Sequence, residues 1–241
     1  MSGATWKALP WVVLLTLASA CGDDEKAPTA VEYGKLLFHD ARLSESQFNS
    51  FSCSTCHATT PTPQGGRMNS GYTLYNVVGR GSWWGGYETN LLDAVNFCYV
   101  SFMRGVQKLP ADSPQSRALY EYLSSISPDT TSPALPYTVV KDVRDVPRGS
   151  AERGRAVYQA ACQECHGETH TGKGRLTELA SILPEVTRNY DETFPGIPHS
   201  LVIIEKVRHG QFFGVGGNMP AYSVEALSDE DLGALLAYLG L

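Results

Sequence analysis

Two Cys-x-x-Cys-His pentads hold most of the residues in this sequence that could do chemistry. They run from Cys53 to His57 and from Cys162 to His166. Two thiols at this spacing can each add to one vinyl group of a porphyrin, and the histidine that follows can bind the iron. A zinc site would need two more ligands close to each pair, and a thioredoxin-like site would need a βαβ pattern. The pentads therefore predict two covalently bound haem c groups, attached at Cys53, Cys56, His57, Cys162, Cys165 and His166.

The N-terminal segment has the pattern of an export signal. Lys7 precedes an apolar run from Leu9 to Ala18, which is much shorter than the ~20 apolar residues of a membrane span. We therefore expect residues 1–20 to be a signal peptide. The small residues before Cys21 are similar to a bacterial lipoprotein processing site, so we expect a lipid on Cys21 and a protein anchored in the periplasm or on the outer surface of a bacterial membrane. Ordinary cleavage, which would leave Cys21 as a thiol, is the alternative.

The count of cysteines leaves one thiol without a role. Four of the six cysteines lie in the pentads, and the other two are Cys21 and Cys98. In an oxidising compartment an unpaired thiol is either buried and inert or kept for its reactivity. Cys98 is therefore a candidate ligand for haem iron.

The charge balance points away from nucleic acid. The chain has 19 basic and 25 acidic side chains and a formal net charge of −6, whereas nucleic-acid binding usually needs a basic surface. A mildly acidic surface suits a basic redox partner, such as another cytochrome or a membrane electron-transfer complex.

The sequence divides into two similar helical parts. Proline recurs between Ser127 and Gly149, which favours extended chain. We therefore predict one domain at residues 30–127 and another at 150–241, joined by a proline-rich linker at 128–149.

Each part begins and ends with matching amphipathic helices. The opening helix carries glycine four residues before an aromatic residue, and the final helix carries tyrosine on its apolar face. The positions are Gly34, Phe38 and Tyr122 in the first part and Gly154, Tyr158 and Tyr238 in the second. An aromatic-over-glycine crossing of the two helices would close each domain. This pattern resembles the class I cytochrome c fold, so we predict an all-α protein of two tandem class I cytochrome c-like domains.

The second domain offers a methionine as the sixth ligand of its haem iron. The segment from Gly217 to Tyr222 is similar to the methionine loop of class I cytochromes, which identifies Met219 as the axial ligand. His199 and His209 are its rivals. Arg175, in the glycine-rich loop after the pentad, is a candidate partner for a haem propionate.

The first domain offers two candidates for the same role. Aligning the final helices of the two domains without gaps places Met103 opposite Met219, so position favours methionine. The leftover thiol favours Cys98. Weaker alternatives are Met68 and His39.

Two segments of the first domain resemble known dihaem enzymes. The stretch from Ala94 to Gly105, followed by Leu109-Pro110, is similar to a segment of the dihaem thiosulfate dehydrogenases and related sulfur-oxidising cytochromes. In that family the cysteine, and not the later methionine, binds the catalytic haem, so the resemblance implies Cys98. The stretch from Gly34 to Ser44 is instead similar to the opening of bacterial dihaem cytochrome c peroxidases.

These features predict an exported dihaem c-type cytochrome that passes electrons from the first haem to the second and on to a redox partner. A thiolate favours ferric iron and a thioether raises the potential, so electrons should leave the Cys98 haem for the Met219 haem. The alternative is an oxidoreductase similar to thiosulfate dehydrogenase acting at the Cys98 haem, and a dihaem peroxidase is a third hypothesis. Whether the chain is an enzyme stays open.

An anionic substrate would need cations near the haem that Cys98 would bind, for which the candidates are Arg67, Arg80 and Arg104. The aromatic side chains of residues 83–87 would either cover one face of the haem or belong to the apolar core that packs around the porphyrin.

Overall fold

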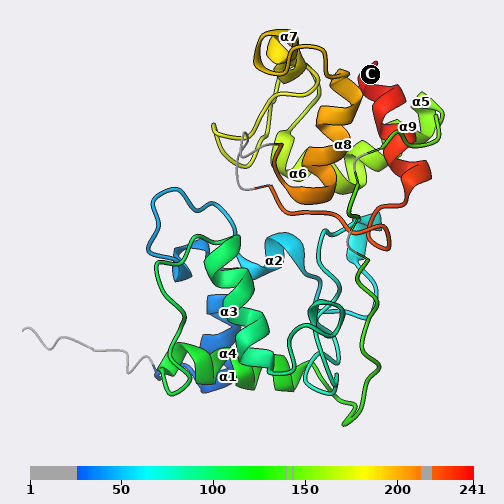
Figure 1. The fold of residues 1–241 in the computed structure, drawn as a ribbon. Helices are drawn as coiled ribbons and strands as arrows, with labels where there is room; N and C mark the ends of the chain where they lie inside the picture. The colour runs from blue at the N-terminus through cyan, green and yellow to red at the C-terminus, as the bar shows by residue number, and fades with distance from the viewer. Residues whose placement is uncertain (1–25, 139, 143, 213–218) are drawn as a thin grey trace, which may run out of the picture.

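The computed structural model describes residues 26–138, 140–142, 144–212 and 219–241. The predicted signal peptide and the predicted lipidation site at Cys21 lie outside the described residues. Two groups of helices pack on each other (Figure 1), and we call them the first half (residues 26–127) and the second half (residues 150–241). No β-sheet forms among the described residues. Of the helices described, none has the length and apolar character that crossing a membrane requires.

The first half is closed by a crossing of α1 (Ala30–His39) and α4 (Pro114–Ser125). A Cβ atom on Gly34 would come within 1.9 Å of the Ala118 carbonyl oxygen. Only glycine therefore allows the two backbones to approach this closely. The other elements of this half are η1 (Ala41–Leu43), α2 (Cys53–Cys56), η2 (Gln64–Gly66), η3 (Trp84–Gly86) and α3 (Leu91–Ser101).

The second half repeats this crossing with α5 (Ala151–Val157) and α9 (Asp229–Leu239). A Cβ atom on Gly154 would lie 1.9 Å from the Ala234 carbonyl oxygen. The remaining elements are the π-helical turn η4 (Tyr158–Cys162), α6 (Gln163–His166), η5 (Glu185–Asn189), α7 (Tyr190–Thr193) and α8 (His199–His209).

An aromatic pair lies beside each glycine. The ring centroids of Phe38 and Tyr122 are 5.4 Å apart, and those of Tyr158 and Tyr238 are 5.7 Å apart. Both pairs are tilted, which is a favourable arrangement for aromatic rings. The predicted all-α fold, with an aromatic-over-glycine crossing in each half, is confirmed.

The apolar cores of the two halves differ in extent. The buried cluster of the first half is confined to the helix crossing. In the second half the cluster extends from the crossing through α8, where Val202 and Ile204 are almost fully buried. Many apolar side chains of the first half line a cavity instead, and this cavity contains the first pentad.

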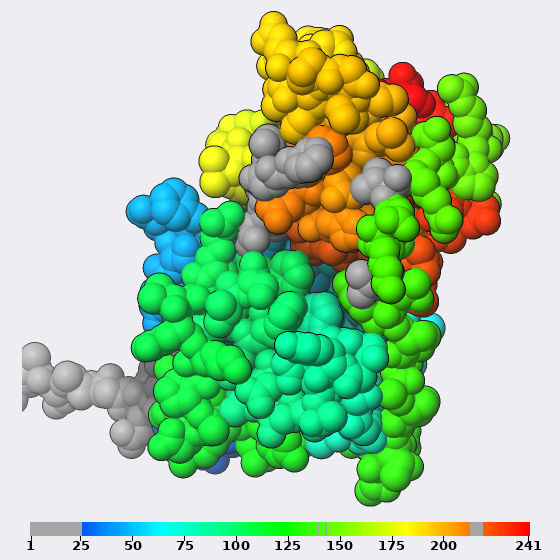
Figure 2. Space-filling model, in the orientation of Figure 1, coloured from blue at the N-terminus to red at the C-terminus, as the bar shows by residue number. Residues whose placement is uncertain are grey.

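The predicted linker is extended and packs along the first half. Ser132 N donates to Gly79 O at 2.9 Å, and the Tyr72 hydroxyl donates to Pro136 O at 2.6 Å. In the space-filling view the linker runs along the edge of both halves (Figure 2). The linker is therefore part of the packed structure.

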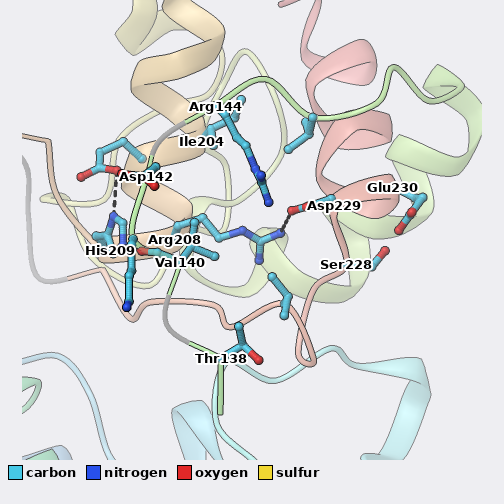
Figure 3. A pocket seen from close by; sticks show the side chains of 14 residues that line it. Thr138, Val140, Asp142, Arg144, Ile204, Arg208, His209, Ser228, Asp229 and Glu230 are labelled. Atoms are coloured by element: carbon cyan, nitrogen blue, oxygen red, sulfur yellow. Dashed lines mark hydrogen bonds and ion pairs between the residues drawn. The ribbon is translucent and has the colours of Figure 1, made fainter. Parts of the chain in front are cut away.

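The linker then lies over α8 of the second half. Thr138 N donates to the Glu225 carboxylate at 3.1 Å, and His209 Nε2 donates to Val140 O at 2.6 Å. Figure 3 shows Thr138, Val140 and Arg144 around a polar pocket whose other wall comes from α8 and the start of α9. The linker is therefore hydrogen-bonded to both halves.

Candidate haem sites

The two thiols of the first pentad lie on one face of a single helical turn. They are at positions i and i+3 of α2, which places them side by side. Burial raises the pKa of Cys53 to about 12 and also raises the pKa of Cys56. Reactive cysteine pairs of redox enzymes have lowered pKa values, so this environment suits thiols that become attached to a buried group.

The imidazole of the first pentad is oriented by the backbone. His57 Nδ1 donates to Tyr72 O at 2.7 Å, which leaves Nε2 with its lone pair available to a metal. Burial lowers the pKa of His57 and so favours the neutral ring. A Cβ atom on Gly71 would lie 2.2 Å from His57 Cε1, so glycine is required beside the ring.

The second pentad has the same arrangement in α6. His166 Nδ1 donates to Ser181 O at 2.8 Å, and the acceptor is fifteen residues downstream in both halves. Burial lowers the pKa of His166, and it raises the pKa of Cys162 to about 12 and that of Cys165 to about 11. Both halves thus combine two neutral thiols with a neutral, oriented imidazole.

The cavity of the first half, which we call the first cavity, brings both candidate axial ligands to the pentad. Cys98 from α3 and Met103 after it both line the cavity, as does His57. Met103 is only 4 % exposed. Burial raises the pKa of Cys98, with a further contribution from the nearby thiols of Cys53 and Cys56. The two sulfur atoms are therefore alternatives at one site.

The two weaker candidates for the sixth ligand of the first haem iron lie outside the first cavity. His39 is exposed at the end of α1, where its ring lies edge-on to Phe38 at 5.1 Å. Met68 lines a different cavity, at the interface of the two halves. Neither side chain lines the first cavity.

A buried amide holds the loop that carries Met103. Asn96 Nδ2 donates to Leu109 O at 3.2 Å, and Leu109 N donates to Asn96 Oδ1 at 2.7 Å. A Cβ atom on Gly105 would lie 2.1 Å from the Tyr99 ring, so the loop returns tightly onto α3. This packing fixes the end of α3 at the cavity.

The aromatic segment 83–87 supplies part of the cavity wall. Trp83 and Trp84 line the cavity, whereas Tyr87 is 79 % exposed. Trp84 has a φ of 53°, a left-handed conformation that costs about 1–2 kcal/mol for a residue with a Cβ atom. Its ring lies 4.7 Å from that of Phe97 and 5.5 Å from that of Tyr137, and these contacts offset the strain.

Only one of the three candidate arginines lines the first cavity. Arg80 is 8 % exposed, Arg104 is exposed, and Arg67 forms an ion pair with Glu164 of the second half. Arg80 Nε and Trp83 Nε1 are buried without a hydrogen-bond partner. Such N–H groups are rare in folded proteins, and a bound group with acceptor atoms would satisfy both of them. The thiols, the imidazole and these donors together fit a haem.

A smaller cavity, which we call the interface cavity, lies between the two pentads. Cys56, Cys165 and His166 line it, and so does Met219. The predicted ligand Met219 is thus on the same cavity as its proximal histidine, while the preceding glycine-rich part of its loop is outside the described residues. In Figure 1, α2 and α6 lie on the facing edges of the two halves.

The rival histidines of the second half are engaged elsewhere. His199 Nε2 pairs with Asp191 at 3.0 Å, and His209 Nδ1 pairs with Glu205 at 2.7 Å. Neither lines the interface cavity. Arg175, the candidate propionate partner, forms an ion pair with Glu178.

Several interface residues were not predicted from the sequence. The Tyr222 hydroxyl donates to Ala161 O at 2.8 Å, and Met68 N donates to Ala160 O at 2.9 Å. Pro220 lines both the first cavity and the interface cavity. No local motif predicts these contacts. The Tyr222–Ala161 bond joins distant segments of the second half, whereas the Met68–Ala160 bond and the position of Pro220 depend on how the two halves pack.

Family comparisons cover both halves of the chain. Residues 149–239 match the family described as cytochrome c oxidase, cbb3-type, subunit III. Residues 28–105 match the family described as di-haem cytochrome c peroxidase. The chain resembles the dihaem c-type cytochromes. The predicted likeness of residues 34–44 to dihaem peroxidases is confirmed, and the match continues through Cys98 and Met103.

One solved structure that is similar to this cytochrome-like chain is the thiosulfate dehydrogenase (TsdBA) from Marichromatium purpuratum in its as-isolated form. The sequence identity is 15 % and the TM-score is 0.41. The match covers 87 % of this chain and 45 % of that chain, so this chain spans less than half the length of that protein. No curated protein matches the chain significantly.

Proposed function

We propose that this chain is an exported dihaem c-type cytochrome that passes single electrons from a first haem site to a second and then to a redox partner protein. The supporting observation is that Cys56 and Cys165, one thiol from each pentad, line the same interface cavity. Haem c would supply the one-electron chemistry at each site. Attachment points this close favour direct exchange between the sites.

Each pentad would hold its porphyrin by two thioether bonds and bind the iron through the histidine. The Nδ1–H···O=C bonds of His57 and His166 would fix the tautomer and strengthen Nε2 as a ligand. Met219 would be the sixth ligand of the second site. In this proposal the domains span residues 30–127 and 150–241, with residues 128–149 as the linker.

For the first site we propose Cys98 as the sixth ligand, with Met103 as the alternative. Coordination by iron would remove the thiol proton that burial otherwise retains. A low-temperature EPR spectrum of the oxidised protein would identify the ligand, because a thiolate-bound ferric haem has a compressed spread of g values. Cys98→Ala should change one of two haem signals and Met103→Leu should change neither. An unchanged Cys98→Ala spectrum would assign the position to Met103.

The direction of electron flow follows from these ligands. A thiolate in the first site and a thioether in the second would give the first site the lower potential. A potentiometric titration should therefore resolve two midpoints, with the lower one altered by Cys98→Ala. Equal, high midpoints would contradict the proposed direction.

An oxidoreductase is the second candidate function. The match to dihaem peroxidases covers residues 28–105, the part of the chain that holds the first cavity, and the segment around Cys98 is similar to thiosulfate dehydrogenases. Stopped-flow mixing of the protein with thiosulfate, and of the reduced protein with hydrogen peroxide, would test both reactions. A carrier should give no turnover with either, whereas turnover that Cys98→Ala abolishes would establish an enzyme.

The proposed anchor is a lipid on Cys21. Cells grown with labelled palmitate should yield a labelled protein in the membrane fraction. Cys21→Ser should release unlabelled protein into the periplasm, and a wild-type protein that is already soluble there would contradict the anchor.

A further inference from the structure

We propose that residues 67–70 of the first half hold the two pentads at the spacing needed for electron exchange, and that Arg67 and Met68 are the positioning residues. We call these four residues the bridging segment. All four line the interface cavity. This inference rests on the proposed function, because it requires a haem at each pentad.

The Arg67 side chain contacts both pentads. Its Nη2 donates to Thr55 O at 3.3 Å, and Thr55 is the residue before Cys56. The same Nη2 forms an ion pair with the carboxylate of Glu164, which is the residue before Cys165. One guanidinium therefore joins equivalent positions of α2 and α6, the two helices on the facing edges of the halves (Figure 1).

Met68 contacts the second half through both its backbone and its side chain. Met68 N donates to Ala160 O at 2.9 Å, and Ala160 lies two residues before Cys162. The half-buried thioether side chain packs on the apolar cluster of the second half. Methionine is flexible enough to fill an irregular gap of this kind. Met68 is thus a residue of the first half that is anchored beside the second pentad.

The chain that follows the bridging segment is bonded to the first pentad. Gly71 N donates to Cys56 O at 3.1 Å, and Tyr72 O accepts from His57 Nδ1 at 2.7 Å. Residues 67–72 therefore connect the backbone beside the second pentad to the imidazole of the first. A change in how this segment sits on the second half would move the two pentads relative to each other.

These contacts suit a positioning role better than a stabilising one. Arg67 and Glu164 are 40 % and 47 % exposed, and exposed ion pairs add little to stability. Hydrogen bonds are directional, so they restrict the spacing and orientation of the segments that they join. The exchange oxidises the iron of the first site by one electron and reduces that of the second by one, and it needs no other reactant. Its rate depends steeply on the separation of the two sites.

The test measures this exchange in protein that carries two haems. Pulse radiolysis would reduce one site per molecule, and the absorption change that follows would report transfer to the other site. Arg67→Gln and Met68→Ala should each slow the transfer by about tenfold, because a misplacement of about 1 Å between reacting groups can cost about a hundredfold in rate.

Conservative variants and distant controls separate positioning from other roles. Arg67→Lys and Met68→Leu should keep more of the wild-type rate than Arg67→Gln and Met68→Ala. The control for the arginine is Arg42→Gln, which removes an exposed ion pair within the first half. The control for the methionine is Val106→Ala, since Val106 is 81 % exposed. Neither control should slow the transfer, and no variant should move the midpoint of either site.

Hydrogen exchange gives a readout that does not depend on electron transfer. The Met68 amide should be protected in the wild type because it is bonded to Ala160 O. Arg67→Gln should speed the exchange of this amide, and Arg42→Gln should not. Faster exchange throughout α1 and α4 as well would indicate a general loss of structure and would overturn the positioning role.

Two further results would overturn the inference. One is a transfer rate that stays at the wild-type value in both Arg67→Gln and Met68→Ala, with two haems counted per chain. The other is a lower midpoint of the second site in Met68→Leu, because Met68 would then be a ligand of the iron. A chain with fewer than two haems would instead contradict the proposed function.

Discussion

The two halves of this chain are closed in the same way but filled differently. In both, a glycine of the first helix lies so close to the last helix that a Cβ atom on it would be 1.9 Å from a carbonyl oxygen. The second half places a continuous apolar cluster behind this crossing. The first half places there a cavity lined by Cys98, Met103 and the buried Arg80.

This difference separates what builds the fold from what sets the chemistry. The crossing and the backbone-oriented imidazole recur in both halves, so they belong to the scaffold. A candidate thiol ligand, Cys98, and the tryptophans Trp83 and Trp84 line the cavity of the first half alone, so they distinguish its chemistry from that of the second half.

The helix crossings should be the most sensitive positions. Gly34→Ala and Gly154→Ala each place a methyl group against a backbone carbonyl group that cannot move away, so each should lower the free energy of unfolding by about 3 kcal/mol. Gly81→Ala is the control, because nothing lies within 4 Å of the position that its new Cβ atom would take. Urea unfolding followed by circular dichroism would measure all three. Equal stability of Gly34→Ala and Gly81→Ala would show that the halves are not closed alike.

Substitution of an axial ligand should change the midpoint potential of one haem site and leave that of the other unchanged. In the proposed function Met219 is the thioether ligand of the second site, so Met219→Leu should lower the midpoint potential of that site by a few tenths of a volt within the ~0.8 V that axial ligands span. Potentiometry should find the midpoint of the first site unchanged. A fall at the first site, or at neither, would contradict Met219 as a ligand of the second site.

Acid should release the linker from the second half. Partial burial alone would raise the pKa of Glu225, but hydrogen bonds from Thr138 and Ser223 outweigh it and lower the pKa to about 2. A lowered pKa stabilises the docked linker fully above the ordinary value of 4.5, and this stabilisation is lost as the pH falls toward 2.

Pepsin cleavage would follow this release. Cutting within residues 128–149 should accelerate as the pH falls from 4.5 to 2, and Glu225→Gln should be cut rapidly throughout. Cleavage of the wild-type linker at one constant rate over this range would exclude the docking role of Glu225.

The ion pair across the interface should have the smallest effect. Arg67 and Glu164 are 40 % and 47 % exposed, and such pairs contribute about 0–1 kcal/mol. A double-mutant cycle with Arg67→Gln and Glu164→Gln should give a coupling within this range that weakens with salt. The control is Arg42→Gln, whose partner Asp40 lies in the same half. A coupling several times larger would mean that this pair holds the halves together.

The parts of the site that depend on local spacing could be predicted from the sequence. The pentads place thiol, thiol and imidazole on one turn whatever surrounds them. The glycine and tyrosine of each crossing could be matched between the halves, because helical periodicity fixes which residues share a face.

The parts that depend on packing between distant segments could not be predicted. Arg67, Arg80 and Arg104 looked equivalent in sequence, yet only Arg80 is buried in the first cavity, because residues 127–132 hold its backbone there. Met68 was a candidate ligand for the first site, but it lies at the interface with the second half. The sequence also leaves Cys98 and Met103 as alternatives, and the fold brings both to the same cavity.

The number and position of the haems is the most direct test of the whole account. Mass spectrometry of the denatured protein should give the mass of the processed chain plus two haem groups. Digestion should then place one haem on the peptide containing Cys53, Cys56 and His57 and one on the peptide containing Cys162, Cys165 and His166. A chain that carries one haem or none after denaturation, when expressed with a working haem-attachment system, would contradict the account.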